Sequence, residues 1–172
     1  MDEKPDFWVV IVDLPERKQI RLKEYDYSTN GAYFITVCTH EKKQLFGSVG
    51  ADSISARMVE RTFLETIQKY DNVKSPVYVV MPNHFHAIIQ IERADMESAP
   101  TISQIIQSFK RYSTVEYIKL VNENKLPRFD GKVWQRSFHD HVVRGEKDYL
   151  EIWNYIEGNP SKWEEDCFYV KE

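Results

Sequence analysis

Cysteine is scarce in this chain, and its scarcity argues against two kinds of protein. Cys38 and Cys167 are the only cysteines among the 172 residues, and they lie far apart and form no CxxC pair. We therefore expect neither a disulfide framework nor a zinc site built on thiolates, and the chain fits a reducing compartment.

Long apolar segments are also missing. The N-terminal residues Met1–Pro5 are acidic and lack a signal-peptide pattern, and the longest early apolar run, Phe7–Val12, is far too short to span a bilayer. The sequence contains no internal repeats and no low-complexity segments. These features predict a cytoplasmic protein with no membrane partner.

An excess of positive charge is lacking as well. The net charge of −4 argues against a protein that coats nucleic acid. The charge is unevenly distributed: residues 101–147 hold 9 Lys and Arg against 5 Asp and Glu, whereas residues 148–172 hold 2 against 7. The basic middle segment fits either a narrow groove for an anionic ligand or a solvated helix face with charged loops.

The chain does contain enough apolar sequence for one domain with a core, at 42% hydrophobic and 29% charged residues. Two apolar, β-branched runs, Val77–Met81 and Ala87–Ile91, flank the pair Pro82-Asn83. Proline suits the first central position of a turn and asparagine the second, so this stretch predicts a tight β-hairpin.

Two histidines open the second strand of this hairpin. Because side chains alternate between the faces of a strand, His84 and His86 point the same way and Phe85 points toward the core. Two imidazoles side by side on a stiff strand supply most of a metal site. A His-x-His pair also arises often by chance, and half-buried histidines often only bond backbone carbonyls.

The remaining patterns predict an α+β domain. They indicate, in order, a strand at Gly31–Thr39, a helix at Ser53–Tyr70, the hairpin at Pro76–Glu92, a helix from Thr101, a strand at Val133–Arg144 and a helix at Glu146–Gly158. When the hairpin is counted as two strands, the first six elements form the ferredoxin-like βαββαβ pattern of an antiparallel sheet, and the helix at Glu146–Gly158 is an additional C-terminal helix. We expect an N-terminal extension at residues 1–24, the domain at 25–160 and an acidic tail at 161–172.

Apolar stripes and caps define the first two helices. Asp52 or Ser53 suits the first N-cap, and Thr101 to Gln104 has the spacing of a capping box. The first stripe comprises Ile54, Met58, Val59, Phe63, Leu64, Ile67 and Tyr70, and the second comprises Ile102, Ile105, Ile106, Phe109, Val115 and Ile118. Of the neighbours Lys110 and Arg111, at least one must face outward.

The last helix carries Tyr155 and, four positions on, Asn159, which share one helix face. If that face packs over the open side of the sheet, Asn159 can offer an amide oxygen as a third ligand beside the histidines. Such a set suits Mg²⁺ or Mn²⁺, and Mn²⁺ tolerates imidazole better. The ion would polarise a phosphodiester while Tyr155 attacks phosphorus. A free tyrosine has a pKa of ~10, so a base is needed, and the sequence does not identify it.

Three ordered motifs, Val80–His86, Trp134–Arg144 and Asn154–Pro160, together resemble the REP-associated tyrosine transposases, a group of the single-tyrosine HUH transposases. The resemblance spans roughly Leu22 to Pro160. It includes Tyr25-Asp26-Tyr27 and the following residues from Gly31, which resemble the first strand of that family. It implies that His84, His86 and Asn159 bind the metal and that Tyr155 is the nucleophile. It also implies the cutting and rejoining of single-stranded, hairpin-forming DNA through a 5′-phosphotyrosine, by a monomer or a homodimer.

Other residues leave alternatives open. Tyr112 and Tyr117 are rival nucleophiles, although on a two-sided helix they favour packing or stacking. His139-Asp140-His141 is a second His-x-His, which fits a rival metal pair, plain strand structure or second-shell support of the site. Candidate phosphate contacts are Lys110, Arg111, Lys119, Arg136 and Arg144, and candidate stacking residues are Tyr112 and Trp134; each fits an exposed charge or a core aromatic as well.

These observations predict a metal-dependent, tyrosine-nucleophile transposase that acts on single-stranded DNA. Two alternatives remain. One is a metal phosphodiesterase that activates water, and the other is a DNA-binding regulator that has lost strand transfer.

Overall fold

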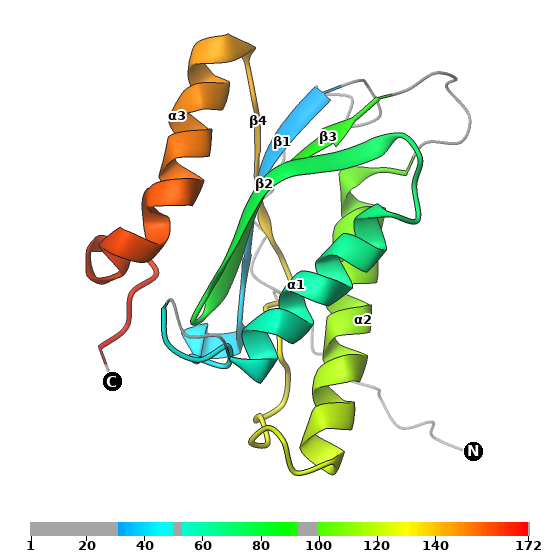
Figure 1. The fold of residues 1–172 in the computed structure, drawn as a ribbon, viewed down its shortest axis with the longest axis vertical. Helices are drawn as coiled ribbons and strands as arrows, with labels where there is room; N and C mark the ends of the chain where they lie inside the picture. The colour runs from blue at the N-terminus through cyan, green and yellow to red at the C-terminus, as the bar shows by residue number, and fades with distance from the viewer. Residues whose placement is uncertain (1–30, 50–52, 93–99, 172) are drawn as a thin grey trace, which may run out of the picture.

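A four-stranded antiparallel sheet forms the centre of the computed structural model, which describes residues 31–49, 53–92 and 100–171 (Figure 1). Its strands are β1 (Gly31–Cys38), β2 (Val73–Met81), β3 (His84–Ile91) and β4 (His139–Val142), in the order β2-β3-β1-β4. This is the ferredoxin-like order, so the predicted fold class is confirmed. The extension expected at 1–24 and the motif Tyr25–Tyr27 lie outside the described residues.

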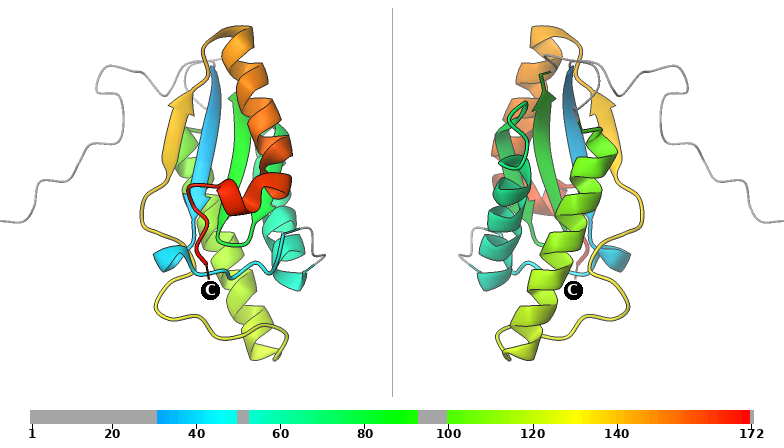
Figure 2. Two further views of the ribbon diagram at one scale, coloured as in Figure 1. Left: turned by 90° about the vertical axis from the view of Figure 1, so that its left-hand side faces the viewer. Right: turned by 90° about the vertical axis from the view of Figure 1, so that its right-hand side faces the viewer.

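Helices cover both faces of the sheet. α1 (Ile54–Ile67) and α2 (Ile102–Asn122) pack on one face, and α3 (Gly145–Gly158) packs on the other, as the views in Figures 1 and 2 agree. The additional C-terminal helix predicted from the sequence is therefore present. Within the described residues, no helix combines the length and the apolar character that a membrane crossing requires.

The alternation of the strands separates a packing face from a chemical face. On β3, Phe85 and Ala87 belong to the large hydrophobic cluster under α1 and α2, as do Ile35 and Val37 on β1. The intervening residues point toward α3, where Ile88 joins a smaller cluster with Val77 and Ile156. The hairpin prediction is thus confirmed, with His84 and His86 on one face and Phe85 in the core.

An aromatic group holds β3 to α1. Phe63 lies 4.6 Å from Phe85, 5.4 Å from Phe109 and 5.5 Å from Tyr78, measured between ring centroids. Because Phe85 lies between the two histidines in sequence, this packing fixes the strand that carries them.

Replacing Phe63 with alanine is expected to lower the free energy of unfolding by about 3–5 kcal/mol, because the ring is fully buried and would leave a cavity. Urea unfolding followed by circular dichroism measures the change. Ile54→Ala, at an exposed position of the same helix, is the control and is expected to change stability by less than about 0.5 kcal/mol. A loss below about 1 kcal/mol for Phe63→Ala would contradict this account of the core.

The helix starts match the sequence signals. Ser53 caps α1 by accepting a hydrogen bond from the Ala56 amide at 3.0 Å. Thr101 and Gln104 form the reciprocal capping box of α2, and both of its bonds are present. Each cap satisfies amides that the first helical turn leaves without partners.

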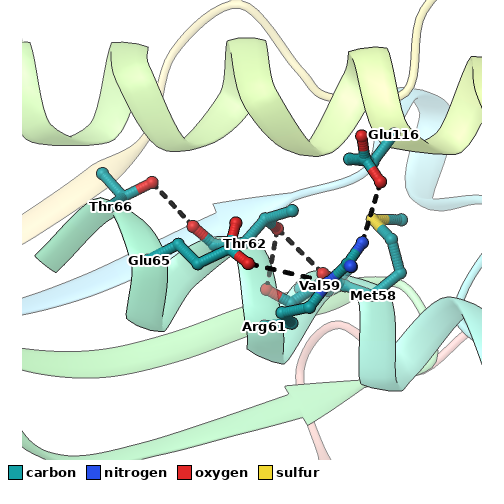
Figure 3. A network of polar contacts seen from close by, with 7 residues as sticks. All are labelled: Met58, Val59, Arg61, Thr62, Glu65, Thr66 and Glu116. Atoms are coloured by element: carbon teal, nitrogen blue, oxygen red, sulfur yellow. Dashed lines mark hydrogen bonds and ion pairs between the residues drawn. The ribbon is translucent and has the colours of Figure 1, made fainter. Parts of the chain in front are cut away.

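Polar contacts also join α1 to α2 (Figure 3). Arg61 on α1 and Glu116 on α2 form an ion pair at 2.8 Å. Within α1, the buried hydroxyls of Thr62 and Thr66 donate to carbonyls of the preceding turn, which satisfies both groups without a partner outside the helix.

Three members of the predicted apolar stripes are exposed. Ile54, Val115 and Ile118 are 43%, 56% and 43% exposed, so their assignment to the core was wrong. On α2, Ser113 and Tyr117 continue the buried face instead, which turns residues 115 and 118 toward solvent. Ile54 is the first residue of α1, and Ser55 and Met58 take its place on the buried face.

The last strand is shorter than predicted. We expected it to span Val133–Arg144, but β4 covers only His139–Val142, and Trp134 forms an isolated bridge with Thr39. The physical reason is a competing partner: the Lys110 ammonium donates to the carbonyls of Gln135 and Ser137 at 2.8 and 2.7 Å. These carbonyls therefore bond a side chain and not a neighbouring strand.

The chain does not leave helical geometry at Asn159-Pro160. Asn159 has φ −57° and ψ −42°, and a 3₁₀ helix, η2 (Asn159–Glu165), follows α3 directly. Proline is tolerated because it occupies the first turn of η2, where no intrahelical amide donor is needed. Asn159 therefore keeps its helical relation to Tyr155.

Candidate active site

The histidine pair lies on β3, at the start of a strand that is paired on both sides. His84 and His86 are 0% and 1% exposed, and their ring centroids are 4.5 Å apart. β3 is held by β1 and β2, with His84 opposite Cys38 and Met81. The pair is therefore fixed in position by the sheet itself.

Hydrogen bonding determines which nitrogen of His84 carries the proton. The Asn83 amide nitrogen donates to the carbonyls of Lys42 and Phe168 at 3.1 and 2.8 Å, so the Asn83 oxygen faces His84 Nδ1, 2.8 Å away. An amide oxygen only accepts, so Nδ1 must be the donor. Nε2 of His84 is then an unprotonated lone-pair atom, and it is buried with no hydrogen-bond partner.

His86 is held in the same way from the neighbouring strand. Its Nδ1 lies 2.9 Å from the Thr36 hydroxyl on β1, and its ring stacks on Phe34 with centroids 5.2 Å apart. Nε2 of His86 therefore faces away from the sheet, 3.4 Å from the Tyr155 hydroxyl. Outer hydrogen bonds of this kind orient metal-binding histidines.

Burial keeps both imidazoles neutral. It lowers the pKa of His84 to about 4, although the nearby Asp166 carboxylate opposes the shift. Burial, reinforced by the neighbouring His84, lowers the pKa of His86 to about 3. Both rings are therefore uncharged at neutral pH, which is the form that binds a cation.

We expect these two pKa values to make the metal-free protein less stable in mild acid. Both folded-state values lie below the ordinary value of 6.5, so the unfolded chain takes up protons first and the stability present above pH 6.5 is lost as pH falls. The slope approaches about 1.4 kcal/mol per pH unit for each histidine. Urea titrations in EDTA from pH 7 to 5 measure it.

The variants His84→Gln and His86→Gln should each flatten that slope. Thr36→Val keeps both imidazoles and removes only a hydrogen bond, so it should lower stability and leave the slope unchanged. A slope that is unaltered in both glutamine variants would contradict the assignment of the acid sensitivity to this pair.

α3 brings the two remaining predicted residues to the histidines. The Tyr155 hydroxyl donates to Asp166 Oδ2 at 3.2 Å, and the Asn159 amide nitrogen donates to the same oxygen at 2.7 Å. Asn159 is buried, and its Oδ1 has no hydrogen-bond partner. Tyr155, His84, His86 and Asn159 thus meet in one place, as the resemblance implied; their roles remain predictions.

Residues after α3 also pack against this group, and the sequence analysis missed them. The Phe168 ring lies 4.8 Å from the His84 ring and 6.0 Å from the His86 ring, and Trp163 lies 5.8 Å from His84. Asp166 completes a set with the two histidines in which one potential ligand atom from each lies within 4.8 Å of the others. No spacing in the sequence distinguishes Asp166 from the six other acidic residues of the last 25.

The electrostatics of Tyr155 and Asp166 follow from their contact. Partial burial, together with the adjacent Asp166 carboxylate, raises the pKa of Tyr155 well above its ordinary value. Burial alone would raise the pKa of Asp166, but hydrogen bonds from the Phe168 amide and Asn159 outweigh it and lower that pKa. Asp166 is therefore an anion beside two neutral imidazoles and a protonated phenol.

The two rival tyrosines lie elsewhere, whereas His139 and His141 lie opposite Thr36 and Phe34 on the edge strand β4. On α2, the Tyr117 ring is buried against Phe129 and the Tyr112 ring is exposed. Both tyrosines therefore belong to the helix layer on the opposite face of the sheet from the histidine pair (Figure 2). His139 and His141 are exposed on β4, where His141 Nε2 lies 2.9 Å from Asp148 of α3. Asp140 is half-buried, and its Oδ2 is buried without a hydrogen-bond partner.

The predicted DNA contacts are scattered over the surface. Arg111 and Lys119 are exposed on α2, Arg136 is exposed in the loop before β4, and Arg144 is exposed at the start of α3. Lys110 is half-buried and engaged with backbone carbonyls. The Trp134 ring is buried against Phe46 and Phe109, and its indole nitrogen donates to Ser113, so stacking on a base would require it to leave the core.

Comparison with known proteins identifies the family. Residues 27–159 match the family described as Transposase IS200 like, so the chain belongs to the IS200-like transposase family. It is also similar to a Haemophilus influenzae protein assigned by name to the REP-associated tyrosine transposases, at 26% identity over 80% of this chain and 74% of that protein. The resemblance indicated by the sequence motifs is therefore confirmed. A second H. influenzae protein, of unassigned function, is 33% identical over 90% of this chain and 93% of its own length.

Solved structures show the same fold. The structure of a REP-associated tyrosine transposase bound to a REP hairpin matches with a TM-score of 0.58 at 22% identity, over 83% of this chain and 74% of that one. The crystal structure of a Deinococcus radiodurans protein assigned as a transposase matches with a TM-score of 0.51 at 16% identity, over 80% of this chain and 95% of that one.

Proposed function

We propose that this transposase is a metal-dependent enzyme that cleaves and rejoins single-stranded DNA through a covalent bond to Tyr155. One observation carries the proposal: the Tyr155 hydroxyl lies 3.4 Å from His86 Nε2, beside a second buried imidazole. A nucleophile and a pair of buried, neutral imidazoles therefore come together within one chain.

The residues of the site fit a divalent cation. His84 Nε2 and Asn159 Oδ1 are buried acceptors without a donor, which is costly unless a cation satisfies them. His84, His86 and Asn159 would hold Mg²⁺ or Mn²⁺, and Mn²⁺ suits a site with two imidazoles better. When bound, the ion supplies Lewis-acid polarisation of a phosphodiester oxygen.

Tyr155 supplies the covalent chemistry in this proposal. Its phenolic oxygen attacks phosphorus, the bond from phosphorus to the 3′-oxygen breaks, and a 5′-phosphotyrosine and a free 3′-hydroxyl result. The phenolic proton is transferred overall to the departing oxygen. In the rejoining step, a 3′-hydroxyl attacks the phosphotyrosine and restores both the diester and the phenol. The reaction therefore needs no external energy source, because each phosphate ester bond that is broken is replaced by another.

The proposed substrate is a single strand that folds into a hairpin. The support is the relative assigned to the REP-associated tyrosine transposases and the solved structure of such a protein bound to a REP hairpin. We expect a hairpin foot to be read by the protein and an adjoining unpaired segment to enter the site.

A labelled hairpin oligonucleotide with single-stranded flanks, incubated with the protein and Mn²⁺, tests the proposal on a denaturing gel. The expected result is a slow-migrating protein–DNA adduct that is lost in EDTA. Cleavage without an adduct would indicate a water-activating phosphodiesterase, and binding without cleavage would indicate a DNA-binding regulator. Either result would overturn the proposed covalent mechanism. A fully paired duplex of the same sequence is the substrate control.

A further inference from the structure

We propose that Asp166 is an additional ligand of the cation held by His84 and His86. This inference rests on the metal site of the proposed function and adds a residue outside the motifs that carry the family resemblance. Ligand atoms of His84, His86 and Asp166 all lie within 4.8 Å of one another, close enough for the three residues to reach a common ion.

Two of the atoms around this position are unpaired acceptors, whereas the Asn159 amide nitrogen and the Tyr155 hydroxyl donate to Asp166. His84 Nε2 and Asn159 Oδ1 are buried and unpaired, and both residues are more than nine-tenths buried. His86 Nε2 has only the 3.4 Å contact to Tyr155, whose hydroxyl lies nearer to Asp166. Two unpaired, buried acceptor atoms beside a carboxylate leave a position that a cation would satisfy.

Asp166 is held in place by the surrounding chain. Its Oδ1 accepts from the Phe168 amide, 2.6 Å away, and its own amide donates to the Trp163 carbonyl at 3.1 Å. Asn83, in the turn between the histidine strand and β2, donates to the Phe168 carbonyl at 2.8 Å. Figure 2 shows that the chain after α3 crosses the face of the sheet that α3 occupies. The carboxylate is therefore presented by a structured turn and not by a loose tail.

A carboxylate changes the chemistry of the site. Two imidazoles and one amide are uncharged ligands, so the predicted set alone offers no net charge to a divalent ion. Asp166 adds one negative charge and a hard oxygen donor, which Mg²⁺ and Mn²⁺ prefer. With four protein ligands, Mg²⁺ or Mn²⁺ would still have room to bind a phosphate oxygen of the substrate.

Titration of Mn²⁺ into the full-length protein without DNA tests the inference, with free Mn²⁺ measured by electron paramagnetic resonance. Asp166→Asn preserves the shape of the side chain and removes its charge, and Asp166→Ala removes the ligand. We expect about a tenfold or larger loss of Mn²⁺ affinity in both variants. Glu165→Gln, an exposed neighbour with the same change in charge, should bind Mn²⁺ as the wild type does.

The variants His84→Ala and His86→Ala separate this inference from the proposed function. If they lose Mn²⁺ binding while both Asp166 variants keep wild-type affinity, Asp166 is not a ligand and the proposed site stands. If the histidine variants bind normally, or the wild type does not bind Mn²⁺, both proposals are overturned. Should the Asp166 variants fail to fold in EDTA, carbon-13 spectra of the wild type decide: Mn²⁺ should broaden the Asp166 carboxyl signal before that of Glu165, and the reverse order would overturn the assignment.

Discussion

Tyr155→Phe is expected to abolish both the covalent adduct and strand cleavage. The substitution removes one oxygen atom, and that oxygen is the proposed nucleophile. Loss of a nucleophile commonly lowers the rate by a factor on the order of 10⁴ or more. The hydroxyl contributes only two hydrogen bonds at a residue that is 42% exposed, so we expect the fold to be retained at a cost of about 1 kcal/mol.

Tyr149→Phe is the matched control, because Tyr149 lies on the same helix and its ring packs against Trp153, with ring centroids 5.8 Å apart. It should form adduct at the wild-type rate on the same gel. Tyr112→Phe and Tyr117→Phe test the two rival nucleophiles directly. An adduct that persists in Tyr155→Phe would place the nucleophile elsewhere, and cleavage that continues without an adduct would indicate that water attacks phosphorus.

Mixing two inactive variants is expected to restore no activity. His84→Ala lacks part of the proposed metal site and Tyr155→Phe lacks the proposed nucleophile. The structure places both residues of one chain in the same site, on either side of His86. Neither chain in a mixture then has a complete site, whatever the oligomeric state. The experiment unfolds the two variants together, refolds them and measures adduct formation against each variant alone.

Two results define the interpretation of this mixture. Wild type taken through the same refolding should regain its activity, which shows that the procedure preserves the enzyme. Activity of the mixture far above that of either variant would show that the nucleophile of one chain serves the histidines of another, contrary to the geometry described here.

The part of the site that could be predicted depends on local patterns. His84 and His86 could be assigned to one face because side chains alternate along a strand and the Pro82-Asn83 turn fixes where that strand begins. Tyr155 and Asn159 could be placed together because they lie one helical turn apart. That this helix packs on the histidine face was a conditional prediction, since a single helix stripe does not specify its partner.

The rest could not be predicted because it depends on contacts between distant segments. Asn83 and Phe168 are 85 residues apart in sequence, and no periodicity marks either as a partner of the other. Asp166 lies in an acidic stretch that predicts a solvated tail. Val115 and Ile118 are apolar residues that fit a helical stripe, but Ser113 and Tyr117 occupy the buried side, and only the packed structure distinguishes them.

The two halves of the site belong to layers of very different size. The histidines lie on β3, which is paired on both edges and covered by the main core, whereas Ile156 is the only residue of α3 that is fully buried. Partial unfolding follows the units with the least buried apolar surface, so α3 is expected to detach at a lower free energy than β3. The buried histidine pair, on a strand of high local stability, thus faces a tyrosine on a helix that can separate from the sheet while the strands stay paired.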